Sequence, residues 1–403
     1  MNKKLHILLI AISLCLPSTL LAGNPLKWFA ENWSAIDSNY VEPSRYDWSL
    51  TLIHDMSQEF MDVKSPDYGM AFNLRSHPSQ KLGPSFGYQW LCGGVSYDFN
   101  AHIEDKDRQK SEFSLNVFSQ LFNIDIFYRN TGGDFYFKKM YMGGTPEFNG
   151  YKFTDVLMSL QDDFAGDMIK TRIVGANAFY VFNHRKFSYP AAWSNSSQQK
   201  ISAGSPLAGF GYTYHRVENN FGPLASEIPV LQALLLEYFP SLKEEFAKHQ
   251  FTFDKICSIQ KFRDWTIWGG YAYNWVPCRN VLIGASATLG LGFKQQYADN
   301  KDFLEYAEEY NNKPTTKYQI SKPAPIVEKT NLVDFNGVGR FSALWNNNKF
   351  YAGGKFNYNF YRYYNANPAL QCFNSFYTME LFLGVKFGEQ KWFKEKKKRM
   401  NNN

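Results

Sequence analysis

The chain has 403 residues, of which 44% are hydrophobic, 18% aromatic and 20% charged, so it carries enough apolar residues for one large domain or two modest ones and is not intrinsically disordered. Beyond the N-terminus no apolar run approaches the roughly 20 residues of a membrane-spanning helix, which excludes a polytopic helical membrane protein. The formal net charge of +6 is concentrated in Lys3, Lys4 and the lysine-rich segment after Gly388. The rest of the chain is neutral, so no nucleic-acid partner is expected.

The first predicted element is a secretory signal peptide over residues 1–22. Lys3 and Lys4 form its basic region, an apolar stretch runs from Leu5 to Leu16, and small residues lead to Ala22. A retained N-terminal anchor is the alternative. Export would leave residues 23–44 as a periplasmic lead-in.

Alternation of apolar and polar residues with a period of two is the strongest signal in the mature chain. It is clear in Arg45 to His54 and in Tyr68 to Arg75, where Tyr68, Met70, Phe72 and Leu74 share the apolar face. At the C-terminal end, one apolar face is formed by Tyr377, Met379, Leu381, Leu383, Val385 and Phe387. This last strand is long enough to cross a bilayer, since about 9 to 11 tilted residues suffice.

The polar faces of these strands are rich in Gly, Ser, Asn and charged residues, whereas the apolar faces end in Tyr, Trp and Phe. This combination predicts an all-β fold, a closed antiparallel transmembrane β-barrel whose exterior contacts lipid. Closure is expected because an open sheet edge in hydrocarbon would leave backbone groups unpaired. A secreted β-sandwich is the alternative.

Loop lengths predict the strand count, because outer-membrane barrels alternate short periplasmic turns with longer outer loops. Asn346 to Asn348 and Pro277 to Arg279 are short, whereas Ala298 to Thr330 and Glu218 to Lys261 are long. The alternation reaches the first strand only if Pro84 to Asn100 is one long strand and Lys186 to Val217 is one interrupted crossing. That gives about 12 strands, with 14 as the alternative, over a barrel of residues 45–388 followed by a basic periplasmic tail, residues 389–403.

One long loop, residues 224–249, has a helical pattern. Apolar residues recur at helical spacing, with Pro229 in the first turn and Pro240 dividing the run, at Ile228, Leu231, Leu235, Tyr238, Leu242 and Phe246. Ser241 and Glu244 would form a capping box for a second short helix. Such a helix is either a lid over the barrel or a loop helix packed on its neighbours.

The segment Gly166 to Gly209 is too particular to be explained by barrel patterning alone. It resembles the hallmark of the domain-of-unknown-function family four-four-two-one, predicted outer-membrane β-barrels of Gram-negative bacteria. The matching core positions are Lys186, Phe187, Ser188, Tyr189, Ala191, Ala192, Gln199, Lys200, Ser202, Ala203, Gly204, Ser205, Leu207 and Gly209. Leu82 to Leu91 and Phe376 to Phe387 are similar to further family segments. The resemblance implies a barrel fold and no particular activity.

Four cysteines follow the signal peptide, at Cys92, Cys257, Cys278 and Cys372, without a metal-binding spacing. No cofactor or metal is expected. Cys257 and Cys278 are the only pair near enough in sequence to nominate for a disulfide, and four unpaired thiols are the favoured alternative.

A catalytic site is not expected, although some outer-membrane barrels are lipid enzymes with a Ser and a His on the wall. If a nucleophile exists, Ser202 or Ser205 with His184 or His215 is the best constellation, because all four lie in or near the marked segment. Small residues lining a crowded interior are the favoured interpretation of that segment.

The sequence therefore predicts an outer-membrane barrel without enzymatic activity, either a narrow pore or a structural and surface-interaction protein. The alternative is a barrel enzyme that hydrolyses or transfers acyl chains of envelope lipids. Under either prediction, the expected partners of the protein are outer-membrane lipid and the barrel-insertion machinery. This machinery tends to recognise a final aromatic strand such as the one ending at Phe387.

Overall fold

The computed structural model describes residues 35–65, 70–88, 91–94, 97–98, 111–132, 135–142, 147–148, 151–152, 169–220, 222, 225–226, 229–230, 233, 236–237, 240, 258–314, 318–320, 322, 324–325, 327–364 and 371–390. Most of them form long strands. The strands are β1 (Val41–Pro43), β2 (Tyr46–Ser65), β3 (Met70–Ser76), β4 (Ser79–Tyr88), β5 (Leu91–Gly94), β6 (Tyr97–Asp98), β7 (Ser111–Phe118), β8 (Phe122–Gly132), β9 (Phe135–Met142), β10 (Glu147–Phe148), β11 (Tyr151–Lys152), β12 (Ile169–Val181), β13 (Ser197–Gln199), β14 (Ala203–Asn219), β15 (Ile259–Cys278), β16 (Val281–Asp299), β17 (Val327–Asn346), β18 (Phe350–Tyr364) and β19 (Gln371–Glu389). Two helices accompany them, α5 (Tyr189–Trp193) and α8 (Lys301–Asn311).

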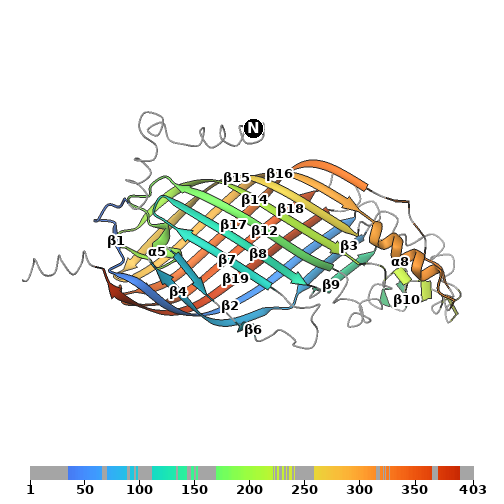
Figure 1. The fold of residues 1–403 in the computed structure, drawn as a ribbon, viewed down its shortest axis with the longest axis horizontal. Helices are drawn as coiled ribbons and strands as arrows, with labels where there is room; N and C mark the ends of the chain where they lie inside the picture. The colour runs from blue at the N-terminus through green and yellow to red at the C-terminus, as the bar shows by residue number, and fades with distance from the viewer. Residues whose placement is uncertain are drawn as a thin grey trace, which may run out of the picture.

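The long strands form one strongly curled, antiparallel sheet. From β7 to β19 the order is β7-β8-β12-β14-β15-β16-β17-β18-β19, and β19 pairs with β2. On its other edge β2 pairs with β4 and β3, and β4 leads through β5 back to β7. The strands run obliquely to the long axis, with α5 and β1 at one end and α8 at the other (Figure 1).

The predicted alternation has its most regular form in β16. From Ala285 to Phe293 its exposed positions are Ala285, Ala287, Leu289, Leu291 and Phe293, and Leu289 is 65% exposed. From Leu282 to Lys294 its buried positions are Leu282, Gly284, Ser286, Thr288, Gly290, Gly292 and Lys294. Successive residues of a strand point to opposite faces, so one face of the sheet is apolar and open while the concave face is small and polar. The same holds in β19, where Met379, Leu381, Leu383 and Phe387 are exposed as predicted.

Tight turns gather at the end of the sheet that carries α5, called the turn end below. Asn280, between β15 and β16, and Asn348, between β17 and β18, have positive φ values of 68° and 77°. Asparagine tolerates this left-handed conformation better than most residues, which suits it to tight reversals. Exposed aromatic side chains lie next to these turns, at Trp48, Tyr88, Phe182, Tyr273, Trp275, Trp345, Phe350 and Phe387. The apolar faces therefore end in aromatic residues at this end of the sheet, as the sequence predicts.

Three predictions about individual strands are wrong. The apolar face of β3 points inward: Phe72 and Leu74 are buried and pack with Phe135 and Phe137 of β9. Alternation alone does not distinguish the inside from the outside, and the interior near β3 is itself apolar. Pro84 to Asn100 is not one strand, because β4 ends at Tyr88 and pairs antiparallel with β5, which begins at Leu91.

The third concerns Lys186 to Val217, which holds a single long strand as predicted, but that strand does not begin at Lys186. Strand β14 begins only at Ala203, and residues 182–202 form turns, α5 and β13 at the turn end. Pro190 lies in the first turn of α5, and Asn195 takes a positive φ of 57° just after the helix, so the chain folds back instead of continuing as a strand.

The predicted helical loop is helical at several of its described residues, including Ala225, Ser226 and Ala233. Its predicted apolar anchors from Ile228 to Phe246, and the capping box at Ser241, lie outside the described residues. Helix α8 lies in the long excursion after β16, where only a loop was expected. Among the described residues, no helix has the length and apolar character needed to cross a membrane.

The ends of the chain are described only in part. Residues 1–22, predicted as a signal peptide, lie outside the described residues, as do residues 391–403 of the predicted tail. Of the lead-in, β1 is described and pairs with β13. Cys278 is a free thiol at the turn end of β15, and Cys257, its nominated disulfide partner, lies outside the described residues.

Candidate functional site: the interior and its plug

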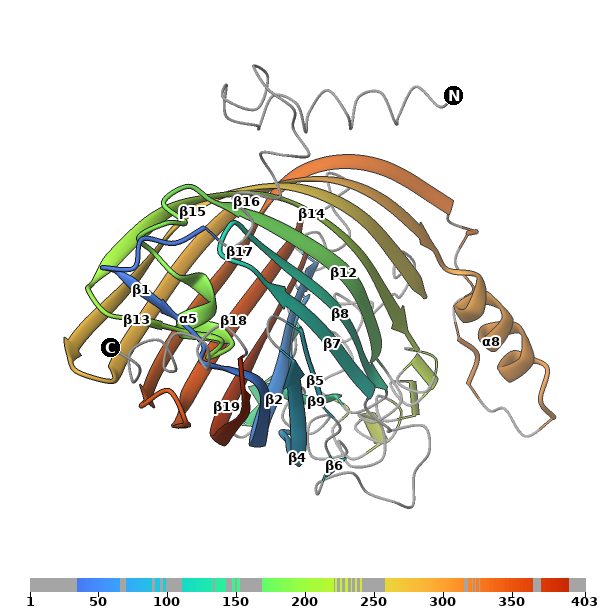
Figure 2. The ribbon, with the colours of Figure 1, turned by 60° about the vertical axis from the view of Figure 1, so that its left-hand side comes forward.

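The family-like segment forms a plug at the turn end. All five residues of α5, from Tyr189 to Trp193, are buried, and Ser188 caps the helix by accepting a hydrogen bond from Ala191 N at 3.2 Å. Figure 2 shows α5 with β1 and β13 beneath the arch of the strands. Gly284 of β16 makes room for the helix, since a Cβ placed there would lie 2.8 Å from the Ala192 methyl group. The plug is thus fitted to the inner wall of the sheet.

Gln199 is the polar hub of this plug. Its Oε1 accepts hydrogen bonds from Ser188 N at 2.9 Å and from Asn274 Nδ2 at 3.2 Å. Its Nε2 donates to the carbonyls of Lys186 at 2.7 Å and Ile201 at 2.8 Å. One buried side chain therefore satisfies backbone groups on both sides of α5, which an irregular buried segment requires.

The remaining motif residues support the same unit. Phe187 is fully buried, and Lys200 donates from Nζ to Ser38 O at 2.9 Å and from its backbone N to Tyr40 O at 2.7 Å, which attaches the N-terminal lead-in. Gly209 lies against β12, where a Cβ would be 2.5 Å from Ala178 O. Gly204 accepts a hydrogen bond from Asn183 Nδ2 at 2.8 Å. The motif is therefore explained by the architecture of the plug.

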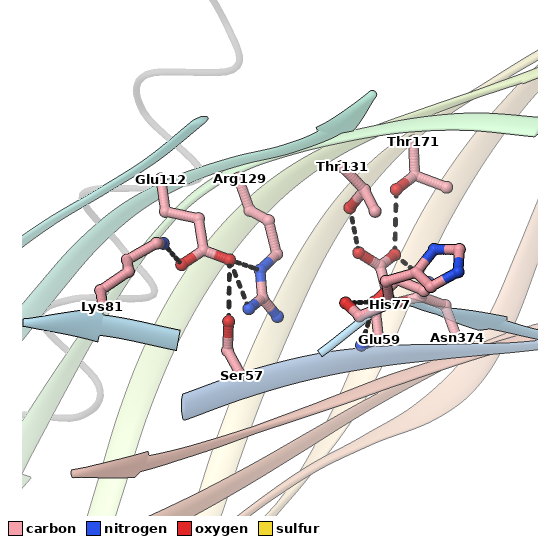
Figure 3. A network of polar contacts seen from close by, with 10 residues as sticks. Ser57, Glu59, His77, Lys81, Glu112, Arg129, Thr131, Thr171 and Asn374 are labelled. Carbon is pink, nitrogen blue, oxygen red and sulfur yellow. Dashed lines mark hydrogen bonds and ion pairs between the residues drawn. The ribbon is translucent and has the colours of Figure 1, made fainter. Parts of the chain in front are cut away.

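Above the plug, the concave face carries buried ionic clusters. Glu112 of β7 accepts hydrogen bonds from Arg129 Nε at 2.7 Å and Ser57 Oγ at 3.2 Å, and it pairs with Lys81 (Figure 3). Arg129 of β8, Ser57 of β2 and Lys81 of β4 thus converge on the one carboxylate of Glu112. A buried carboxylate needs such partners because its desolvation is costly.

Glu59 of β2 is the centre of a second cluster. Thr171 of β12 donates to it at 3.0 Å and Asn374 of β19 at 2.6 Å, and Thr131 of β8 donates as well (Figure 3). Glu59 is on β2 and Thr171 is on β12, and the four strands β4, β5, β7 and β8 lie between β2 and β12 in the sheet. A single side chain therefore bridges the interior from wall to wall.

A third cluster lies on the inner face of β15 to β17. Lys294 Nζ is 3.3 Å from Asp264 Oδ2 and donates to Asn336 Oδ1 at 2.8 Å, and both charged side chains are at most 1% exposed. Asn336 Nδ2 donates to Asp264 Oδ2 at 2.7 Å. Gly292 is required beside them, because a Cβ there would lie 2.5 Å from Asp264 Oδ1.

A fourth contact joins the plug to the walls. Arg340 of β17 donates to the Tyr189 hydroxyl at 2.9 Å and pairs with Asp125 of β8, although four strands separate β8 from β17 in the sheet. Burial raises the pKa of the Tyr189 phenol, which therefore stays protonated and can donate as well as accept.

Toward the end that carries α8, called the loop end below, the interior becomes apolar. A buried cluster joins strand residues to Phe303 and Ala307 of α8. Tyr363 of β18 stacks on Phe262 of β15 with ring centroids 4.2 Å apart, and Arg129 lies 4.4 Å from the Phe376 ring. Side chains from different walls thus meet at several levels between α5 and α8.

The candidate Ser and His residues are not brought together. Ser205 Oγ accepts from Asn183 N and donates to Pro206 O, both at 2.8 Å, and Ser202 Oγ accepts from Val276 N at 2.9 Å. His215 lies ten positions along β14 from Ser205, roughly 30 Å away, in a cluster with Phe262 and Tyr363. His184 is buried near the turn end, and this burial lowers its pKa.

These serines therefore serve backbone groups and have no imidazole partner among the described residues. Within the same part of the chain, no group of three His, Cys, Asp or Glu side chains could hold a metal ion.

Sequence reasoning missed the ionic clusters, although one signal was available. Glu59, Asp264 and Lys294 each fall on the inward face of a long strand, where a charge needs a partner. Which partner each would find depends on strands distant in sequence, so the pairs themselves were not predictable from spacing.

Comparisons with solved structures give weak similarity over most of the chain. The outer membrane protease OmpT of Escherichia coli is 7% identical, with a TM-score of 0.35 over 88% of this chain and 98% of that one. OprG of Pseudomonas aeruginosa is 9% identical, with a TM-score of 0.22 over 86% and 98% of the two chains. The toluene transporter TodX of Pseudomonas putida is also 9% identical, with a TM-score of 0.22 over 88% and 98%.

No curated protein sequence matches this one. A family model does match, over residues 35–387, which include the plug and every long strand. The chain therefore belongs to the DUF4421 family, a domain of unknown function.

Proposed function

We propose that this chain is an outer-membrane β-barrel of about 12 strands whose interior is filled by its own side chains, and that it works as a non-conducting structural and surface-interaction protein. The observation that carries the proposal is the set of wall-to-wall contacts in the interior, above all Arg340 to Asp125 and Glu59 to Thr171. In an open pore, the side chains of opposite walls would have to be far enough apart for water and ions to pass between them.

Closure is supported by the pairing register. Followed in one direction, the paired residues lead from Phe179 through β14 to β19 and arrive at Met61 of β2. Followed in the other direction, they lead from the neighbouring Ala178 to Trp48 of the same strand. The ring thus returns to β2 with a stagger of about 14 residues, which for about 12 strands corresponds to a tilt of about 40°, the range of membrane barrels.

The exterior supports a membrane location. On β16 the open apolar face runs from Ile283 to Phe293, which at this tilt spans about 25 Å, the height of the apolar band of outer-membrane barrels. Aromatic residues border it at the turn end, beginning with Trp275. The short turns then belong on the periplasmic side with both ends of the barrel segment, and α8 on the outer side. Lipid and the barrel-insertion machinery are the partners that this location requires.

The proposal is tested with the full-length protein purified from membranes. We expect fractionation with the outer membrane, a mobility shift between unboiled and boiled gel samples, and no steady conductance in planar bilayers. The double variant Arg340→Ala/Tyr189→Ala should admit ion leakage because it removes side chains that bridge the interior, whereas the exterior variant Leu289→Ala should not. Steady channels in the wild-type protein would contradict the filled interior, and a soluble protein without a mobility shift would contradict the barrel.

A further inference from the structure

The outer face of β12, β14 and β15 changes from apolar to basic near the loop end. Tyr212 and Trp265 are paired in register, and their rings pack 5.5 Å apart at the border of the apolar band. Four residues further toward the loop end, Arg216 lies directly opposite Lys261. The basic residues of this surface, called the basic patch, are Lys170, Arg172, Arg216, Lys261 and Arg263.

Three members of the basic patch form one row across the strands. Arg172 of β12 pairs in register with Arg216 of β14, which pairs with Lys261 of β15. Like charges placed directly opposite each other on neighbouring strands are destabilising. A row of three such residues therefore calls for a neutralising partner.

The positive charges of the basic patch are only partly neutralised by neighbouring side chains. On the same face of these three strands, Glu218 is the one acidic side chain among the described residues, and it pairs with Arg216 at 2.5 Å. Lys261 lies 5.3 Å from the Tyr297 ring. Arg172 and Arg263 are exposed and form no ion pair within the described part of the chain. Positive charge is therefore left in excess just beyond the aromatic border.

We infer that the basic patch binds the phosphate groups of an anionic lipid in the outer leaflet. The inference rests on the proposed membrane location, which places the patch at headgroup depth with its α8 end outward. Guanidinium groups suit phosphate because they donate two parallel hydrogen bonds, and the adjacent Tyr212 and Trp265 suit the start of the acyl chains. Between its two basic ends the chain is neutral on average, so its composition does not show that basic residues are gathered in this patch.

The test uses the full-length protein in neutral detergent, with lipid A carrying two phosphates as the probe and its dephosphorylated form as the comparison. Binding is measured by native mass spectrometry or by titration at two salt concentrations. We expect the wild type to prefer the phosphorylated form and to lose affinity as salt rises. The variant Arg172→Gln/Arg263→Gln should bind about thirtyfold more weakly, since each basic residue near a membrane surface contributes about 1 kcal/mol.

The matched control is Arg279→Gln/Lys349→Gln, which removes two exposed positive charges at the turn end. It should bind the lipid as tightly as the wild type. Equal binding by the patch variant and this control would overturn the inference, and so would competition by inorganic phosphate at the same concentration as the lipid. The boiled and unboiled gel comparison is run on the same samples, so that failure of the barrel itself is distinguished from failure of lipid binding.

Discussion

The two ends of the interior are filled by different means. At the turn end, a short buried helix is held by hydrogen bonds from single side chains, chiefly Gln199 and Ser188, to backbone groups. At the loop end, Phe303 and Ala307 of α8 join a large apolar cluster. An irregular segment enclosed by the curled sheet therefore needs its polar groups satisfied one by one, whereas a helix packed over an apolar interior is held by burial.

Between the two ends lies the buried pair of Lys294 and Asp264, and breaking it should have the largest effect. Lys294→Met leaves the Asp264 carboxylate buried without its cation, so we expect a loss of about 3 to 5 kcal/mol in the free energy of unfolding. The measurement is urea unfolding in detergent micelles, followed by tryptophan fluorescence. The double variant Lys294→Met/Asp264→Leu should recover much of the loss. A double variant as unstable as the single one would show that the pair is not the cause.

Removing the polar hub of the turn end should have a smaller effect. Gln199→Leu deprives Ser188 N and the carbonyls of Lys186 and Ile201 of their partners, and we expect a loss of about 3 kcal/mol. Limited proteolysis should then cut residues 182–202 faster than in the wild type. Gln198→Leu is the matched control, because that side chain donates to Asn280 Oδ1 and to the carbonyl of Asn346 at the tight turns instead. Equal rates of proteolysis in the two variants would contradict the role of Gln199 as the polar hub.

The smallest expected effect is a pH dependence confined to the turn end. Burial lowers the pKa of His184 below its ordinary value of 6.5, so the unfolded chain takes up the proton more readily than the folded one. The stabilisation is complete above about pH 6.5 and decreases as the pH falls below that value. We expect proteolysis of the plug to accelerate between pH 7 and pH 5 in the wild type and much less in His184→Asn. An identical acceleration in both proteins would assign the effect to other groups.

Much of the wall could be predicted from sequence because the property that forms it is local. Alternation in β2 and β19 marks the exposed apolar face of each strand, and Asn280 and Asn348 lie where the chain reverses between other strands. The prediction failed for β3, whose apolar residues face an apolar interior, and for Pro84 to Asn100, which is divided between β4 and β5. Alternation identifies two faces of a strand, but it does not say which face points inward or where a strand ends.

The site was less predictable than the wall. The sequence motif lies in Gly166 to Gly209. Its positions from Lys186 to Gly209 form the plug and the start of β14, and they do not form a catalytic site. The separation of Ser205 from His215 follows directly from the extended form of β14. The predicted helical loop remains a prediction over most of its length.

The strand-rich fold, the apolar exterior and the neutral charge of the chain between its two basic ends follow from the sequence alone, because each depends on residue types and their local spacing. Which charges meet is set by the tertiary structure. Glu59 finds Thr171 and Asn374, and Arg340 finds Asp125, through strand pairings that bring positions hundreds of residues apart onto one inner surface. It also placed Arg172, Arg216 and Lys261 in one row, because register across strands is set by the whole sheet and not by any single strand.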